Sequence, residues 1–306
     1  MNRRRRKPRR ILLKVFIFAL LAVSVYVFAI AGSDEMQTLV NRVTGERATS
    51  LSLQTEASSD RVPAGFSLFT AEVSVAGIVD TGYLRLVNRD HGITTPVNGA
   101  HLSTVWPDMP ARTSYVTLHE TAFIAMRELF RAAQNAGINS LFIASGYRSQ
   151  EEQRYLYENA VDKAYVMPPG HSEHQTGLAA DILSSADIPS MRGSEEARWL
   201  AENTSQFGLI LRYPEDKQDI TGVPYEPWHF RYVGRVHAWF MGQRGFVLEE
   251  YIAYLQANGG YQAEMGDRTY YVLYQRPENG MILVPEHLNF WISSANTGGY
   301  IVTAWR

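Results

Sequence analysis

Two short stretches of the sequence carry side chains that can bind a metal ion and activate a water molecule. The first, residues 168–181, reads PPGHSEHQTGLAAD and contains His174 and Asp181. The second has the four residues EPWH and ends at His229. Three protein ligands with an open fourth position are typical of a catalytic zinc, whose general base is commonly a nearby carboxylate that does not bind the metal. A hydrolytic zinc site, with Glu226 as the spare carboxylate, is therefore one interpretation of these stretches.

Each of these residues also has a purely structural interpretation. A single histidine near a turn, or an aspartate after small apolar residues, is usually hydrogen-bonded within the fold, and short motifs often match by chance. Pro227 disfavours helical conformation at Glu226, and in an extended strand Glu226 and His229 point to opposite faces. Both can reach one metal only if the chain turns at Pro227 and Trp228. Otherwise a strand begins here, with Glu226 exposed and Trp228 and His229 buried.

The sequence contains no cysteine. It therefore has no disulfides, no cysteine nucleophile and no thiolate zinc site. Any metal must be bound by histidine nitrogens and carboxylate oxygens, which are the ligands that the two stretches offer.

Apolar residues at helical spacing predict the helices that would support these stretches. The predicted helices cover residues 117–136, 150–163, 194–205 and 236–256. Ser149 and Glu152 form a capping-box pattern at the start of the second helix, and Ser194 is the expected cap of the third. Gly242 and Gly245 should interrupt the last helix.

Short apolar runs predict strands between these helices. The predicted strands cover residues 83–87, 140–144, 208–212 and 230–233. Pro168, Pro169 and Gly170 require a loop just ahead of His174. Because helices and strands mix without regular βαβ units, the sequence predicts an α+β fold.

A small β-rich appendage is predicted at the C-terminus, over residues 259–306. Gly259 and Gly260 mark its boundary, and four short segments of alternating polarity follow. These segments cover residues 269–275, 280–284, 290–293 and 300–303. Asn279 and Gly280 are typical of a hairpin turn, which would join the first two segments.

The N-terminus has the pattern of a membrane anchor. Residues 1–14 contain eight of the 29 basic residues, and residues 15–32 form an uncharged run of 18. As a helix this run is ~27 Å long at ~1.5 Å per residue, close to the ~30 Å hydrocarbon core of a bilayer. We expect a basic cytoplasmic head over residues 1–14 and a single transmembrane signal anchor over residues 15–32. The alternative is a signal peptide cleaved after Ala31, since Ala29, Ile30 and Ala31 form an A-x-A site.

The rest of the chain is then expected outside the cell membrane, on the cell-wall side. Residues 33–64 are polar and are predicted to form an extracellular stalk, and residues 65–258 to form the folded domain. Without the basic head, 21 basic and 31 acidic residues remain, a net charge of −10. This acidic body argues against nucleic acid as a partner, and no protein partner is evident.

The sequence around both stretches resembles the signature of the VanY-type zinc D-alanyl-D-alanine carboxypeptidases. The matching positions are Ser172, His174, Gly177, Ala179, Asp181, Glu226 and His229. Residues 145–149, which read SGYRS, and Gln153 also match this family in the expected order and spacing. The resemblance covers residues 66–256, so the head, the stalk and the appendage lie outside it.

The resemblance implies a compact domain in which helices flank a central antiparallel sheet. It also implies one zinc ion per chain, bound by His174, Asp181 and His229. Glu226 would be the catalytic base that takes a proton from the zinc-activated water and passes it to the leaving amine. Arg148 would contact the substrate carboxylate or the developing oxyanion. The remaining implied residues, which would line the substrate cleft, are Tyr147, Gln153 and Ser172.

The substrate that the resemblance implies is a peptidoglycan stem peptide, from which the enzyme would remove the terminal D-alanine. A related L,D-carboxypeptidase or peptidoglycan endopeptidase would use the same ligands, so these activities are the alternative. A non-catalytic wall-binding module is disfavoured because Glu226 is present. His171 and His237 are expected to be structural residues rather than ligands.

Overall fold

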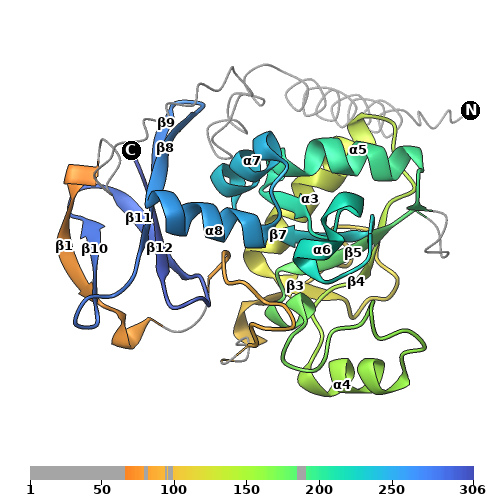
Figure 1. The fold of residues 1–306 in the computed structure, drawn as a ribbon. Helices are drawn as coiled ribbons and strands as arrows, with labels where there is room; N and C mark the ends of the chain where they lie inside the picture. The colour runs from red at the N-terminus through yellow and green to blue at the C-terminus, as the bar shows by residue number, and fades with distance from the viewer. Residues whose placement is uncertain (1–65, 79–81, 94, 96–98, 185–190) are drawn as a thin grey trace, which may run out of the picture. The chain divides into compact units, whose positions relative to one another are not determined.

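The computed structural model describes residues 66–78, 82–93, 95, 99–184 and 191–306 (Figure 1). The predicted head, membrane span and stalk, residues 1–64, lie outside these described residues. Within the described part of the chain, no helix is both long enough and apolar enough to cross a membrane. The described residues up to 263, together with those from 269 onward, belong to one compact unit that contains all of the predicted site.

A four-stranded antiparallel sheet lies at the centre of the fold, as predicted (Figure 1). Its strands, in spatial order, are β4 (Phe142–Ser145), β5 (Ala179–Leu183), β7 (His229–Tyr232) and β6 (Leu209–Leu211). The register pairs Asp181 on β5 with His229 on β7 and with Ser145 on β4. The sheet thus brings three separate parts of the chain to one place, and the predicted α+β class is confirmed.

Helix α3 (Glu120–Asn135) packs an apolar face into the core that it shares with this sheet. Its buried residues recur at helical spacing. They are Ala122, Ala125, Met126, Leu129, Phe130 and Ala133. The helix begins at residue 120 rather than 117, because β3 (Thr117–His119) pairs with β2 (Leu102–Thr104). The spacing of apolar residues cannot predict that residues 117–119 pair with another strand.

Helix α4 (Gln150–Asn159) begins at the predicted capping box. Ser149 Oγ accepts a hydrogen bond from the Glu152 amide at 3.1 Å. In return, Glu152 Oε2 accepts one from the Ser149 amide at 2.7 Å. The helix ends before residue 163 because Ala160 has an extended backbone.

The two later helices also follow the prediction. Ser194 caps α5 (Glu195–Asn203). The last predicted helix divides into α7 (Arg235–Arg244) and α8 (Leu248–Asn258), and Gly245 makes the break with a left-handed φ of 61°. Among the described residues, the remaining α-helix is the short α6 (Gln218–Thr221).

The predicted strand over residues 83–87 is wrong, because this segment is buried from Leu84 onward but joins no sheet. Two of its backbone amides instead form hydrogen bonds with single acceptor groups near the end of β11. The Leu84 amide donates to Ser293 Oγ at 3.1 Å. The Leu86 amide donates to the Ala295 carbonyl at 3.2 Å. Because these partners are single groups rather than a continuous strand, no ladder forms.

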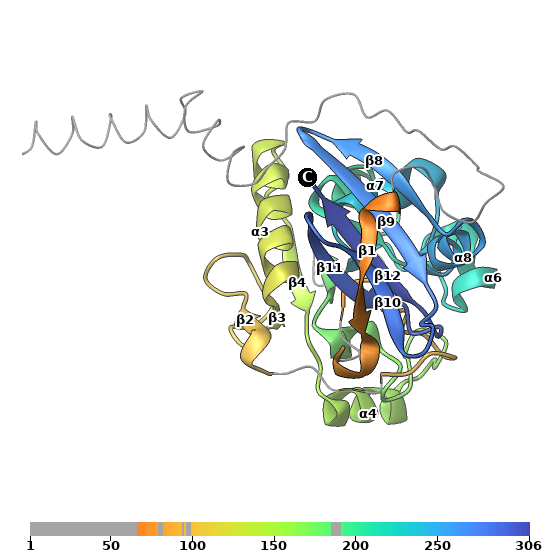
Figure 2. The ribbon, with the colours of Figure 1, turned by 90° about the vertical axis from the view of Figure 1, so that its left-hand side faces the viewer.

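The C-terminal strands form two antiparallel sheets (Figure 2). One contains β11 (Asn289–Ser294), β12 (Tyr300–Trp305), β9 (Arg268–Gln275) and β8 (Gly260–Met265), in that order. The other pairs β10 (Met281–Pro285) with β1 (Phe69–Ser74). The predicted strand segments are confirmed, and one partner comes from the beginning of the described chain. The domain boundaries at residues 65 and 259 stay predictions.

The predicted hairpin at Asn279 and Gly280 is wrong in its partners. Both residues adopt left-handed φ angles, 52° and 76°, as a tight turn of this kind requires. Strands β9 and β10 nevertheless lie in different sheets. The Gln275 side chain donates to the Leu283 carbonyl at 2.7 Å and accepts from the Leu283 amide at 2.8 Å, as a neighbouring strand would. The turn could be read from the sequence, but the strand partner could not.

Candidate metal centre and active site

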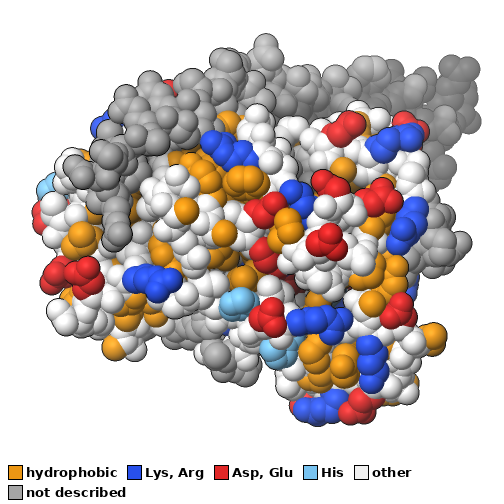
Figure 3. Space-filling view, in the orientation of Figure 1, with side chains coloured by type: hydrophobic (Ala, Val, Ile, Leu, Met, Phe, Trp, Pro, Cys, Tyr) orange, Lys and Arg blue, Asp and Glu red, His pale blue; other side chains and the backbone are white. Residues whose placement is uncertain are grey.

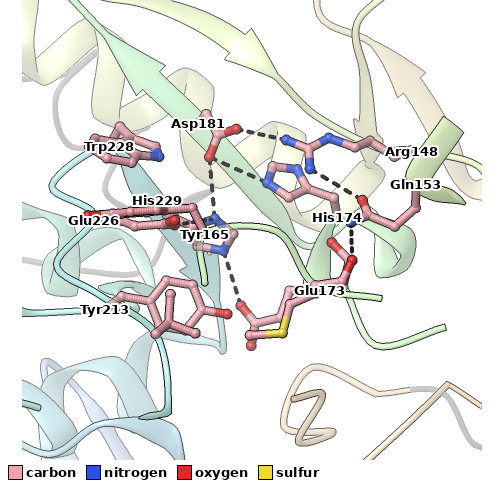
Figure 4. Close-up of a pocket in the computed structure, with 13 residues that line it drawn as sticks. Arg148, Gln153, Tyr165, Glu173, His174, Asp181, Tyr213, Glu226, Trp228 and His229 are labelled. Carbon is pink, nitrogen blue, oxygen red and sulfur yellow. Dashed lines mark hydrogen bonds and ion pairs between the residues drawn. The ribbon is translucent and has the colours of Figure 1, made fainter. Parts of the chain in front are cut away.

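The three predicted ligands meet beside the central sheet (Figure 4). His174 lies in a 3₁₀ helix (Glu173–Thr176), Asp181 on β5 and His229 at the start of β7. One ligand atom from each lies within 4.8 Å of the other two. Asp181 Oδ1 is 3.4 Å from His174 Nε2 and 3.3 Å from His229 Nδ1. The structure therefore groups all three side chains around one point.

A glycine sets the path of the chain between His174 and Asp181. Gly177 ends the 3₁₀ helix with a φ of 69°. A Cβ atom at this position would lie 3.0 Å from the His119 amide nitrogen, a steric clash with a backbone atom that cannot easily move away. Glycine thus permits both the left-handed turn and the close approach that lead into β5.

The chain turns at Pro227 and Trp228, which resolves the geometry that the sequence left open. The His229 amide donates to the Glu226 carbonyl at 3.1 Å and closes a tight turn. Glu226 Oε2 consequently lies 3.7 Å from His229 Nδ1. Both side chains are buried, so the alternative with an exposed Glu226 is wrong.

Each histidine of the predicted ligand set turns one ring nitrogen toward Asp181 and the other toward a second protein acceptor. His174 Nδ1 lies 2.7 Å from the Gly146 carbonyl, which can only accept, so this nitrogen carries the proton. His229 Nε2 lies 3.4 Å from a carboxylate oxygen of Glu173. The opposite nitrogens, His174 Nε2 and His229 Nδ1, are the ones presented to a metal.

This arrangement fits a zinc ion. Asp181 Oδ1 is buried and has no hydrogen-bond partner, although two ring nitrogens face it. Its distances to them, 3.4 and 3.3 Å, match the edges of a tetrahedron whose metal–ligand bonds are about 2.0–2.1 Å. Nitrogen and oxygen ligands without thiolate also suit this metal.

The site buries several ionisable groups close together, and they shift one another's pKa values. Burial raises the pKa of Glu226 to about 8, an effect that the neighbouring carboxylates Asp181 and Glu173 strengthen. Burial opposes ionisation of Asp181, but the two histidines and Arg148 hold its pKa well below the usual range. Burial also disfavours the charged form of His229, yet the nearby carboxylates of Asp181 and Glu173 raise its pKa to about 9. A divalent cation would neutralise this group of carboxylates.

A pocket lies over this centre, and three of the predicted substrate-contacting residues line it (Figure 4). These residues are Arg148, Gln153 and Ser172. The Arg148 guanidinium donates to Asp181 Oδ2 at 3.0 Å and to Gln153 Oε1 at 3.3 Å, which fixes it beside the ligands. Tyr147 is half-buried and is not among the residues that line this pocket.

Several residues of the pocket were not predicted from the sequence. They are Tyr165, Met167, Glu173, Tyr213, Val223 and Trp228. Glu173 could have been proposed from the sequence, because it is an ionisable residue between the motif positions Ser172 and His174. Tyr213, whose ring centroid lies 4.8 Å from that of His229, could not, because no periodic pattern or motif includes it.

Comparison with known proteins places this site in a family. The VanY family model, described as D-alanyl-D-alanine carboxypeptidase, matches residues 115–235, which include every predicted site residue. The chain is 37% identical over 186 residues to the bifunctional D-Ala-D-Ala dipeptidase and D-Ala-D-Ala carboxypeptidase VanXYC of Enterococcus gallinarum. That match covers 94% of the relative and 56% of this chain. The chain belongs to the VanY family.

Two further curated relatives are similar to this VanY-family chain over part of their length. The D-alanyl-D-alanine carboxypeptidase of Enterococcus faecium is 40% identical over 179 residues, 58% of each protein. The carboxypeptidase of the same name from Enterococcus faecalis is 44% identical over 143 residues, 42% of this chain and 52% of the relative. The matched part of this VanY-family chain thus spans little more than half the length of these two relatives.

A solved structure supports the fold of this VanY-family chain. It is the vancomycin resistance D,D-dipeptidase VanXYg, in complex with a D-Ala-D-Ala phosphinate analogue. The two chains are 31% identical and superpose with a TM-score of 0.67, over 77% of this chain and 98% of the other. The resemblance seen in the motifs is therefore confirmed in sequence and in fold.

Proposed function

We propose that this VanY-family chain is a zinc-dependent D-alanyl-D-alanine carboxypeptidase that removes the terminal D-alanine from peptidoglycan stem peptides. The proposal is carried by Asp181 Oδ1, which is buried and unpartnered between His174 Nε2 and His229 Nδ1. These three residues would hold one zinc ion per chain. Family membership supports the substrate, since two curated relatives are named for this activity.

Glu226 is suited to move the proton in this reaction. A bound zinc ion would act as a Lewis acid and lower the pKa of a water molecule toward ~7. Glu226 Oε2, 3.7 Å from His229 Nδ1, lines the same pocket and would accept the proton of that water. As the water oxygen adds to the peptide carbonyl carbon and the C–N bond breaks, Glu226 would return the proton to the amine of the departing D-alanine.

Arg148 is suited to bind negative charge on the substrate. It lies on the far side of the ligands from Glu226 in Figure 4. Its guanidinium donates to Ser145 Oγ at 3.0 Å as well as to Asp181 and Gln153, so it is fixed before substrate binds. A fixed guanidinium in the pocket would bind the terminal carboxylate of the peptide or stabilise the developing oxyanion.

Three synthetic substrates test the proposed activity. Full-length zinc-loaded protein would be incubated with a pentapeptide ending in D-Ala-D-Ala, a tetrapeptide ending in one D-Ala, or a cross-linked stem-peptide dimer. We expect mass analysis to show loss of one alanine from the pentapeptide alone, and no reaction in the presence of a chelator. Cleavage of the tetrapeptide or the dimer instead would indicate an L,D-carboxypeptidase or an endopeptidase. No cleavage of any substrate would favour a wall-binding module.

We also propose that residues 15–32 anchor the enzyme in the cell membrane, with the folded domain on the cell-wall side. The support is the sequence pattern, in which an uncharged run of 18 residues follows eight basic ones. Protease added to intact protoplasts should release a soluble fragment that begins within residues 33–64. A C-terminus that stays protected would contradict this orientation.

A further inference from the structure

Behind the metal centre lies a buried charged layer that the proposed reaction does not use, formed by Glu173, Arg212 and Arg231. On the face drawn in Figure 3, charged side chains are spread over the surface in contact with water, their usual location. Arg212 and Arg231 instead have 0% exposure, and Glu173 has 1%. Burial of ions is unfavourable unless each is paired, so the contacts within this layer define its role.

Glu173 divides its two oxygens between the arginines and a predicted zinc ligand. Oε1 accepts from Arg212 Nε and from Arg231 Nη1, both at 2.8 Å. Oε2 lies 3.4 Å from His229 Nε2. Because two guanidinium groups hold Oε1, the carboxylate cannot rotate without breaking both bonds. Its second oxygen is thereby directed at one nitrogen of His229.

The two arginines are fixed in turn by distant parts of the chain. Arg212 donates to both oxygens of Glu249 on α8, at 2.9 and 2.6 Å. Arg231 donates to the carbonyl oxygens of Tyr83 and Arg85, each at 3.0 Å. These carbonyls belong to residues 83–87, the segment that joins no sheet. Because they are not used in a strand ladder, they can accept hydrogen bonds from Arg231. The charged layer is therefore braced on two sides.

We propose that Glu173 is a positioning residue for the metal centre. By accepting the Nε2 proton of His229, it fixes the imidazole ring and directs Nδ1 toward Asp181 Oδ1, 3.3 Å away, where zinc would bind. The inference rests on the proposed function in one respect, that His174, Asp181 and His229 hold a zinc ion. It does not depend on which peptide bond is cleaved.

Two substitutions separate this role from simple charge balance. In Glu173→Gln the one remaining acceptor oxygen would bond the two arginines. The side-chain NH₂ group would then face the Nε2 proton of His229, and two donors cannot form a hydrogen bond with each other. Glu173→Asp keeps the charge but is one methylene shorter, so it cannot reach both the arginines and His229. Glu128→Gln on α3 is the matched control, since it removes a carboxylate that pairs with Arg235 at 2.6 Å.

Zinc affinity is the first readout, measured by chelator competition on protein shown to be folded by circular dichroism. We expect Glu173→Gln to bind zinc about 10–100-fold more weakly than the parent, the usual effect of removing the partner of a metal-bound histidine. Glu173→Asp should also bind more weakly, and Glu128→Gln should bind like the parent. A folded Glu173→Gln protein with the zinc affinity of the parent overturns the proposal.

The protonation of His229 is the second readout and needs no substitution. Nitrogen-15 NMR of the zinc-loaded parent, labelled in histidine, should show the His229 proton on Nε2 and the His174 proton on Nδ1. A proton on His229 Nδ1 overturns the proposal even if both Glu173 variants fail to fold. A parent that passes both readouts but releases no D-alanine would refute the proposed activity and leave this inference standing.

Discussion

In the described part of the chain, buried histidines lie in two polar clusters with opposite properties. At the predicted metal centre, His174 and His229 face Asp181 Oδ1, a buried oxygen without a hydrogen-bond partner. In the second cluster, His237 on α7 has both ring nitrogens bonded within the protein. Nδ1 bonds to the Tyr251 hydroxyl, and Nε2 lies 3.1 Å from Thr303 Oγ1. His237 is thus the structural residue that the sequence led us to expect.

The charges around the two clusters differ as much as the hydrogen bonds. Burial lowers the pKa of His237 to about 3, and no neighbouring charge opposes this shift. Burial acts in the same direction on His229, but Asp181 and Glu173 more than offset it and raise the pKa to about 9. Burial of a histidine therefore does not make a metal site. Such a site also needs a convergent acceptor for which the protein supplies no donor.

Removal of one ring from each cluster tests this contrast most directly. His229→Ala should reduce bound zinc from one per chain to almost none and D-alanine release to background, because two ligands do not complete the site. His237→Gln should keep its zinc, since the partners of His237 form no site for a metal. Metal analysis after gel filtration checks both variants. Zinc retained by His229→Ala, or lost from folded His237→Gln, would contradict the contrast.

Within the metal centre, Glu226 should affect the rate without affecting the metal. Glu226→Gln keeps the shape of the side chain but cannot accept a proton. We expect D-alanine release to slow by about 10²–10⁴-fold, which corresponds to about 3–5 kcal/mol of barrier, at unchanged zinc content. Rate and zinc content should be measured on the same preparations. A fully active variant, or one without zinc, would exclude Glu226 as the base.

Acid should destabilise the protein through the His237 cluster. The pKa of His237 is about 3 in the folded protein, against about 6.5 for a free histidine, so between these values the unfolded chain binds one more proton. The free energy of unfolding should fall as the pH is lowered through this window, by about 1.4 kcal/mol per pH unit and about 5 kcal/mol in all.

Urea unfolding at several pH values between about 6.5 and 5 checks this prediction. The free energy of unfolding should fall more steeply with acid for the parent than for His237→Gln, because the variant lacks the titrating ring. The carboxylates of the metal centre are present in both proteins and cancel in the comparison. Equal slopes would show that His237 is not the group responsible.

The smallest effect is expected at the partner of His237 on β12. Thr303→Val removes the hydroxyl that bonds His237 Nε2 and leaves this buried nitrogen unsatisfied. The free energy of unfolding should fall by about 1–3 kcal/mol, with zinc content and rate unchanged. Thr303→Ser keeps the hydroxyl and serves as the control. Weaker zinc binding in Thr303→Val would mean that the two clusters are not independent.

Features of the fold that depend on neighbouring residues could be predicted from the sequence. The capping box at Ser149, the apolar face of α3 and the break at Gly245 each involve residues a few positions apart, so spacing alone reports them. The sequence also singled out His174, Asp181, His229 and Glu226, because a zinc hydrolase needs particular residue types in a recognisable motif; their roles stay predictions. The proximity of these four side chains in the structure agrees with that motif.

Features that depend on partners far away in the sequence could be identified only from the tertiary structure. Glu173 bonds Arg212 across 39 positions of sequence and Arg231 across 58. No pattern indicated that Arg231 would be buried, since arginines are expected at the surface. The physical reason is that a charge can be buried only where its partners are already in place. Those partners come from segments that folding, rather than adjacency in the sequence, brings together.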